Sequence, residues 1–221
     1  MKTLKLQAKD FKEVNGYKEY IGKEDLSDFD GNLEFEANLG WIKVSSIKVT
    51  GYISIKAGNS IEAGDLIEAG NWIEAGGSIK AGGLIEAGDW IKAGNSIEAG
   101  DWIEAGDWIE AGNWIEAGDS IEAGDWIKAG DWIEAVRGGV TAGLQITCTG
   151  LLKFKLRLFA GTSPYTWDED CSKEVKCGKL EGNVVYGDVT ETGLPDEEVA
   201  TEEKEVIVLN GKKYQLIEEN K

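Results

Sequence analysis

The chain has 221 residues, with 23 basic and 41 acidic side chains, a formal net charge of −18 and no histidine. Without an imidazole, one copy of the chain lacks Ser/His/Asp and Cys/His catalysis and His-based zinc sites. It also lacks the roughly 20-residue apolar run that spans a bilayer, a signal-peptide pattern and, among its three cysteines, any CxxC spacing. We therefore expect a cytoplasmic protein with reduced thiols and with no enzymatic activity, cofactor, metal site or membrane contact.

Residues 1–50 are predicted to form an amino-terminal cap and the first strands of the fold. They mix Lys, Asp and Glu with three short apolar alternations, which predict strands at residues 33–35, 42–44 and 47–49. A cap is expected because the open end of a repeat stack exposes unpaired backbone and an apolar interior.

Residues 51–162 contain a six-residue repeat. An isoleucine recurs every six residues from Ile55 to Ile133, which gives 14 copies of Ile-(Glu/Lys)-Ala-Gly-x-x. A helix would distribute these isoleucines around its axis, whereas an extended chain points Ile and Ala to one face. The following Gly, with Asp, Asn or Gly behind it, suits a corner because these residues tolerate left-handed and bend dihedrals. After one inserted residue, the register continues at Val140, Ile146, Leu152 and Leu158.

The variable positions indicate how many sides complete one coil. The residue before Ile repeats with a period of 18, as Ser60, Leu66 and Trp72 are followed by Ser78, Leu84 and Trp90. The charge after every third Ile alternates in sign, along Lys56, Glu74, Lys92, Glu110 and Lys128. Rungs of such a stack lie about 4.8 Å apart, where opposite charges attract.

These patterns predict an all-β fold, a three-sided parallel β-helix with 18 residues per turn and about six turns, capped at both ends. Ile and Ala fill its bore. The hand stays open, with the crossover rule favouring a right-handed coil and the usual hexapeptide coil being left-handed.

Residues 163–221 are predicted to form a carboxyl-terminal cap. Just before it, residues 152–158 alternate as a strand whose basic outer face we interpret as a counter-charge for that cap. The acidic residues 190–204, which include Pro195, predict a linker. Residues 205–209 and 212–217 flank Asn210-Gly211, which is a strong signal for a hairpin.

The outer surface of the repeat is strongly acidic. Residues 51–135 carry 17 acidic and 4 basic side chains, a net charge of −13. About 4.7 turns make a rod of about 22 Å, so the net charge is roughly one per 1.7 Å, as in duplex DNA. This density is compatible with a nucleic-acid mimic that binds the basic groove of a host protein, and the alternative that the charge serves solubility alone stays open.

One column of identical carboxylates sharpens the choice between mimicry and solubility. Like charges stacked on one side repel, so they are poor choices for stability alone. We therefore predict that four glutamates bind a partner: Glu68, Glu86, Glu104 and Glu122.

Seven tryptophans occupy the outward position before Ile. Four of them fall in one column and are the second set of predicted partner-binding residues: Trp72, Trp90, Trp108 and Trp126. Two interpretations stay open, a docking wall for a partner or a second copy, and stacked indoles that stabilise neighbouring rungs. The negative surroundings disfavour direct binding of nucleic acid.

The sequence also resembles known repeat proteins. The run GNLEFEANLGWIKVSSIKVTGYISIKAG, the SIEAG and WIKAG units and the closing LKFKLRLFAG resemble a group of hexapeptide-repeat β-solenoid proteins from Firmicutes and their phages or prophages, over roughly residues 26–190. The group carries no assigned activity, so the resemblance implies the architecture and a bacterial or phage setting. The chain is more distantly similar to hexapeptide acyltransferases and bactofilins, but it lacks the acyltransferase histidine and the small residue two positions before the aliphatic one.

Two hypotheses follow from the sequence. The first is a non-enzymatic, phage- or prophage-encoded protein in the cytoplasm of a bacterial host, which inhibits a nucleic-acid-binding defence factor of the restriction or CRISPR type. The alternative is a structural scaffold, a homodimer or filament that assembles through its Trp walls or its coil ends.

Overall fold

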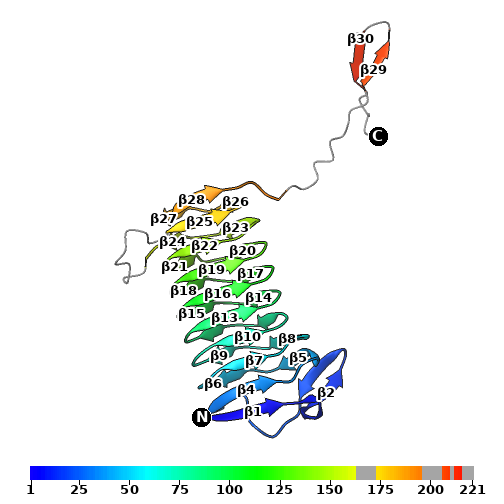
Figure 1. Ribbon diagram of the computed structural model, residues 1–221, viewed down its shortest axis with the longest axis vertical. Coiled ribbons are helices and arrows are strands. Elements are labelled where there is room, and N and C mark those ends of the chain that lie inside the picture. Colours follow the sequence, from blue (N-terminus) through cyan, green and yellow to red (C-terminus); the bar gives the residue numbers. More distant parts are fainter. Residues whose placement is uncertain (163–172, 196–205, 210–211, 216–221) are drawn as a thin grey trace.

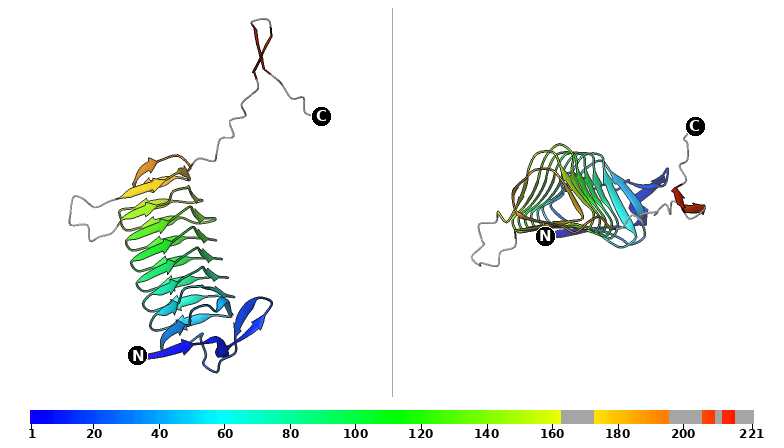
Figure 2. Two further views of the ribbon diagram at one scale, coloured as in Figure 1. Left: turned by 45° about the vertical axis from the view of Figure 1, so that its right-hand side comes forward. Right: turned by 90° about the horizontal axis from the view of Figure 1, so that it is seen from above.

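The computed structural model is a stack of about eight parallel β-coils with three sides and almost no helix (Figure 1). It describes residues 1–162, 173–195, 206–209 and 212–215, the last two ranges by their backbone alone. The repeat coils have 18 residues per turn, and Figure 2 shows them superimposed when viewed along the stack. The predicted three-sided solenoid is therefore confirmed. It is longer than the expected six turns because segments assigned to the caps also form coils.

Each side of the solenoid is one parallel sheet, apart from a hairpin at the start of sheet B. Sheet A runs β1 (Lys2–Leu6), β4 (Gly31–Phe35), β7 (Ile53–Ile55), β10 (Ile73–Ala75), β13 (Trp90–Ala93), β16 (Trp108–Ala111), β19 (Trp126–Ala129), β22 (Gln145–Thr147), β25 (Glu174–Cys177) and β28 (Asp188–Glu191). Sheet B runs β2 (Phe11–Val14), β3 (Tyr17–Tyr20), β5 (Gly40–Val44), β8 (Asn59–Ala63), β11 (Ile79–Ala81), β14 (Ile97–Ala99), β17 (Ile115–Ala117), β20 (Ile133–Ala135), β23 (Leu151–Phe154) and β26 (Lys179–Glu181). Sheet C runs β6 (Ile47–Val49), β9 (Ile67–Ala69), β12 (Ile85–Ala87), β15 (Ile103–Ala105), β18 (Ile121–Ala123), β21 (Val140–Ala142), β24 (Leu158–Ala160) and β27 (Val184–Tyr186).

The bore is filled by the isoleucine and alanine of each strand. Every isoleucine of the repeat from Ile61 to Ile133 has no exposed side-chain surface, and the alanines are buried as well. Ile and Ala of one strand pair with the same residues one coil later, as Ile85 does with Ile103. Burial of apolar surface in this continuous bore is the main favourable term for folding.

The first repeat differs from the prediction. Ile53 pairs with Ile73 and Ile55 pairs with Ala75, so Ser54, and not Lys56, lies beside Glu74. Lys56 is exposed beyond the end of β7 and does not belong to the alternating charge column. The six-residue pattern extends one unit too far toward the amino terminus because Ile53 and Ile55 are both apolar and lie in the same strand. The inserted residue near position 136 is accommodated as predicted, since Ile121 pairs with Val140.

The two ends of the solenoid are built differently. At the amino-terminal end, a short 3-10 helix (Ala8–Asp10) leads into the β2–β3 hairpin, and Leu26 and Phe29 are buried there with the bore residues. At the other end, β26, β27 and β28 are the last strands of their sheets, and no strand among the described residues pairs with their outer edges. Val185, Tyr186 and Val189 are exposed on this last coil. β1, β2 and β6 are likewise terminal strands of their sheets. The ends differ in that Leu26 and Phe29 are buried at the amino-terminal end, whereas apolar side chains are exposed beside the strand edges of the carboxyl-terminal end.

Two predictions about the carboxyl-terminal region need correction. Residues 152–158 are not one strand, because β23 ends at Phe154 and β24 begins at Leu158, with a corner between them. The predicted linker also begins too early, since β28 extends to Glu191; most of its remainder lies outside the described residues. The hairpin is confirmed as antiparallel strands β29 (Val206–Leu209) and β30 (Lys212–Gln215). Among the described residues, none of the helical structure has the length and hydrophobicity of a membrane-spanning helix.

The corner glycines are needed for a reason other than the one that the sequence suggests. Of the corner glycines from Gly58 to Gly130, Gly58 alone has a positive φ, so the corners after the first repeat unit do not use left-handed backbone. Instead, a Cβ added at Gly82 would collide with the carbonyl oxygen of Gly64 in the preceding coil. Only glycine permits the corners to stack this closely.

Two neighbouring glycines should therefore respond oppositely to alanine. Gly82→Ala should lower the free energy of unfolding by about 1–3 kcal/mol, because the new methyl group forces the corner apart. Gly83→Ala should be neutral or slightly stabilising, because its Cβ meets Asp65 at 3.2 Å and aspartates already occupy the equivalent corner position in other coils. Denaturant unfolding of both variants checks this, and equal destabilisation would contradict the steric explanation.

Candidate functional site

The outer face of sheet C carries the predicted glutamate column. Glu68, Glu86, Glu104 and Glu122 occupy equivalent positions on β9, β12, β15 and β18 and pair directly from strand to strand. Each follows a buried isoleucine and precedes a buried alanine, so the alternation of the strand fixes its side chain outward. The structure therefore brings these four predicted residues together in one ladder.

The glutamate ladder is neutralised at one end only. Lys48 on β6 forms an ion pair with Glu68, with Nζ and Oε1 2.8 Å apart. None of the ion pairs within the described ranges involves Glu86, Glu104 or Glu122. Burial, and then the neighbouring carboxylates of Glu68 and Glu104, raise the pKa of Glu86 above its ordinary value of 4.5. The ionised carboxylate of Glu86, at the centre of this ladder, therefore lowers the stability of the fold.

A second acidic column follows the corner between sheets C and A. The corner backbone stacks in register, with the N–H of Asp107 donating to the carbonyl of Asp89 at 2.6 Å and that of Asp125 donating to Asp107 at 2.6 Å. These aspartates form no ion pair with any described residue. Each lies three residues after a glutamate of the sheet C ladder. We call the six carboxylates of these three coils the acidic face: Glu86, Asp89, Glu104, Asp107, Glu122 and Asp125.

Sheet B has a further glutamate ladder that the sequence analysis did not single out. Glu98, Glu116 and Glu134 are consecutive on β14, β17 and β20. Lysines close this ladder at both ends, since Lys80 contacts Glu98 at 2.8 Å and Lys153 contacts Glu134 at 2.7 Å. Lys153 was expected to be a counter-charge for the carboxyl-terminal cap, but its ion pair is with Glu134 of the repeat itself. These glutamates are 18 residues apart, so a comparison of the charged positions on each side of the coil would have predicted this ladder.

The corner between sheets B and C is neutralised by the residue insertion. Arg137 follows Val136, which replaces the usual corner glycine. Its guanidinium contacts Asp119 at 2.8 Å and reaches Asp101, one coil further away, at 3.5 Å. This one side chain therefore spans two rungs. No described Lys or Arg forms such an ion pair with the aspartates of the acidic face at the next corner.

The predicted tryptophan column forms a continuous stack on the outer face of sheet A. Tyr52, Trp72, Trp90, Trp108 and Trp126 lie ring on ring, with centroids 4.4 to 4.9 Å apart and planes within 4° of parallel. Each indole covers the ring face of its neighbour, so the contacts of these faces are made within the chain. The stack also extends to Tyr52, which the sequence analysis did not include.

Lysines flank this aromatic stack as expected. Glu110 contacts Lys128 at 3.1 Å and Lys92 at 3.8 Å, so the alternating column does form ion pairs in its central part. This arrangement shows that the chain places lysine between stacked glutamates on sheet A and omits it from the acidic face.

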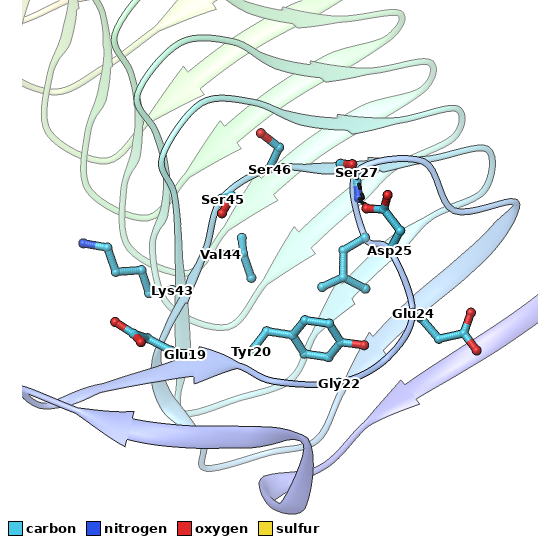
Figure 3. Close-up of a pocket in the computed structure, with 11 residues that line it drawn as sticks. Glu19, Tyr20, Gly22, Glu24, Asp25, Ser27, Lys43, Val44, Ser45 and Ser46 are labelled. Carbon is cyan, nitrogen blue, oxygen red and sulfur yellow. Dashed lines mark hydrogen bonds between the residues drawn. The ribbon is translucent and has the colours of Figure 1, made fainter.

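A cavity of about 670 Å³ lies at the amino-terminal end, between the β2–β3 hairpin, the loop that follows it and the turn after β5 (Figure 3). Two of its charged side chains have structural partners. The Asp25 carboxylate accepts hydrogen bonds from the backbone and hydroxyl of Ser27, at 2.9 and 2.7 Å, and Lys43 pairs with Glu62. The cavity thus follows from the loop crossing the coil.

Metal and thiol chemistry find little support in the described part of the chain. It contains no group of three or more acidic or cysteine side chains placed to hold a metal ion. Cys148 and Cys177 are free and buried, and burial raises the pKa of Cys148 to about 12. A thiol with so high a pKa is almost wholly protonated near neutral pH and is a poor nucleophile. Cys171 lies outside the described residues.

No protein-family model, curated protein or solved structure matches the chain.

The cost of the glutamate ladder can be measured. Because the raised pKa belongs to the folded state, ionised Glu86 destabilises the fold at pH 7, and this cost disappears as the pH falls through that pKa and below 4.5. Glu86→Gln should therefore raise the free energy of unfolding at pH 7 by about 0.2–1 kcal/mol. The gain should vanish at about pH 4 and below, where the carboxyl becomes protonated in both the folded and the unfolded state.

Glu110→Gln is the matched control for this experiment, because Glu110 lies between two lysines. It should lower stability at pH 7, opposite in sign to Glu86→Gln. Urea unfolding at several pH values gives both differences, and a change of the same sign in the two variants would contradict the ladder interpretation.

Proposed function

We propose that the chain is a non-enzymatic nucleic-acid mimic, whose acidic face binds the basic groove of a host nucleic-acid-binding protein. The observation that carries the proposal is the acidic face itself, six carboxylates on three successive coils without an ion pair among the described residues. Solubility alone requires charge, but it does not require identical charges to be stacked where they repel.

The spacing of the acidic face supports mimicry. Two carboxylates per coil at about 4.8 Å per rung give one charge per roughly 2.4 Å of axis, against about 1.7 Å in duplex DNA. A groove that binds phosphates through Lys and Arg would meet a comparable density of negative charge.

The rigidity of the acidic face is a second support. Its glutamates project from paired strands, and its aspartates project from a corner whose backbone is hydrogen-bonded from coil to coil. Because the backbone that carries the carboxylates is already ordered before binding, only side-chain conformational entropy remains to be lost when a partner binds. A disordered acidic tail would lack this advantage.

The proposal extends to a biological setting through the sequence resemblance. Similarity to proteins of Firmicutes and their phages favours a phage- or prophage-encoded inhibitor that acts in the cytoplasm of a bacterial host. Restriction and CRISPR-type complexes are the targets that we propose, because they hold nucleic acid in positively charged channels.

Affinity capture tests the proposal. The full chain, immobilised and exposed to host lysate, should retain proteins that bind nucleic acid and should release them when duplex DNA is added. Retention should weaken steeply between about 50 and 200 mM salt, because salt screens contacts between many charges. Converting Glu68, Glu86, Glu104 and Glu122 to Gln should reduce the affinity of a captured protein at least tenfold.

The control variant changes the same number of charges elsewhere. Converting Glu13, Glu19, Glu24 and Glu36 to Gln alters four carboxylates near the amino-terminal end, away from the acidic face. It should reduce affinity far less than the ladder variant. Equal losses would show that net charge alone matters, and capture that DNA does not compete for would overturn mimicry.

The open carboxyl-terminal end favours a second candidate, a scaffold that assembles end to end. Exposed strand edges bind further strands readily, and the apolar side chains of Val185 and Val189 are exposed beside them. The aromatic stack is the other surface predicted for a homodimer or filament.

Sedimentation velocity separates the scaffold from the mimic. A scaffold should form dimers or longer species at tens of micromolar, and Val189→Lys should return it to a monomer because a charged edge opposes strand addition. Trp108→Ala would do so only if the aromatic stack were the interface. A monomeric wild-type chain at this concentration would contradict the scaffold.

A further inference from the structure

Sheet C carries one indole whose ring is not covered by the next coil. The residues before the bore isoleucine or valine on this sheet are, in order, Leu66, Leu84, Trp102, Ser120 and Gly139. Elsewhere tryptophans stack on one another, as Trp114 and Trp132 do on sheet B at 5.0 Å. Trp102 has no ring partner among the described residues and is 52% exposed. Its exposure follows from the small residues on the two coils after it.

These small residues leave a hollow on the surface. Two adjoining cavities, of about 290 and 350 Å³, share Ser120 and Glu122. We define the hollow by the residues of their floor and lower wall: Trp102, Glu104, Ser120, Glu122, Gly139 and Thr141. Residues 155–157 and Phe159 form its far wall, where the corner after β23 crosses.

The charges around the hollow are divided between its two ends. Glu104 and Glu122 lie at the end next to Trp102, and they take part in no ion pair with a described residue. Lys155 and Arg157 lie at the far end, three coils away from Trp102. A cation is therefore attracted to the Trp102 end and repelled from the far end.

We propose that this hollow binds the guanidinium group of an arginine side chain of the protein partner, stacked on the Trp102 indole and bonded to Glu104 and Glu122. The inference rests on the proposed function in one respect, because a basic groove supplies the arginine. It adds a specific contact that general charge attraction does not provide.

The geometry favours arginine over other side chains. A guanidinium is planar, stacks on aromatic faces and donates in a fork that matches a carboxylate. A guanidinium stacked on Trp102 would occupy the position that the indole of the next coil occupies in the other columns. Lysine lacks the planar group, and a neutral ring would leave both carboxylates without a partner.

The test uses a short peptide as the probe. Acetyl-Gly-Arg-Gly-amide is titrated into the full chain with ¹⁵N-labelled tryptophan, and the Trp102 indole N–H signal is assigned from a Trp102→Phe variant. The arginine peptide should shift this signal saturably. The citrulline peptide, which has the same shape without the charge, should bind at least tenfold more weakly, and the lysine peptide should also be weaker.

Ser120→Trp separates loss of binding from loss of folding. The new indole should stack on Trp102, as Trp132 does on Trp114, and fill the hollow without lowering the melting temperature. Arginine binding should fall at least tenfold. Unchanged binding in this folded variant, or equal binding of the citrulline peptide, would overturn the inference.

Charge variants give an independent check. Glu104→Gln with Glu122→Gln should weaken arginine binding about tenfold or more, whereas Glu98→Gln with Glu134→Gln changes the same charge on sheet B and should leave it nearly unchanged. Equal effects of the two pairs would mean that the hollow has no specific role.

The outcomes also distinguish this inference from the proposed function. If the peptide binds as described but no nucleic-acid-binding protein is captured, arginine binding in the hollow is supported and nucleic-acid mimicry is contradicted. If a DNA-binding protein is captured equally well by Ser120→Trp and by the wild type, mimicry stands and the hollow does not contribute to it.

Discussion

The structure depends on one constraint, that each coil must place its backbone directly over the preceding coil at the spacing of a parallel sheet. This spacing lets Ile and Ala of one coil pair with the same residues of the next and bury them completely. It also requires glycine at the corners, where stacked backbones approach so closely that no Cβ fits. The six-residue unit thus satisfies both the bore and the corner.

The same constraint gives opposite results for different side chains on the outer surface. Stacked indoles gain ring contacts at 4.8 to 4.9 Å, and stacked Glu and Lys gain ion pairs. Stacked carboxylates gain no contact and repel one another, and this repulsion adds to burial in raising the pKa of Glu86. Burial and two neighbouring glutamates raise the pKa of Glu116, at the centre of the sheet B ladder, in the same way. The acidic face differs in extent, because none of its six carboxylates forms an ion pair with a described residue.

Most of the fold could be predicted because the repeat is regular, and the misses lie where regularity ends. The period of 18 defines the coil and places the glutamate and tryptophan columns. Lys56 was misplaced because two apolar residues in one strand allow two alignments. Residues 152–158 were read as one strand because their alternation continues through the corner at 155–157. The hollow beside Trp102 was missed because it depends on small residues one and two coils away, and no local pattern marks a ring that lacks a neighbour.

The departures from the repeat also carry the most information about binding. A perfectly regular rod would offer the same surface on every coil, and a partner would slide along it without a fixed position. The insertion at Arg137 neutralises one corner, and the change from Trp102 to Ser120 and Gly139 opens a hollow on the neighbouring side. These two irregularities lie within a few coils of each other and define one place along the axis. In the proposed interaction, the repeat would supply the charge and its interruptions would supply one fixed position along the axis for the partner.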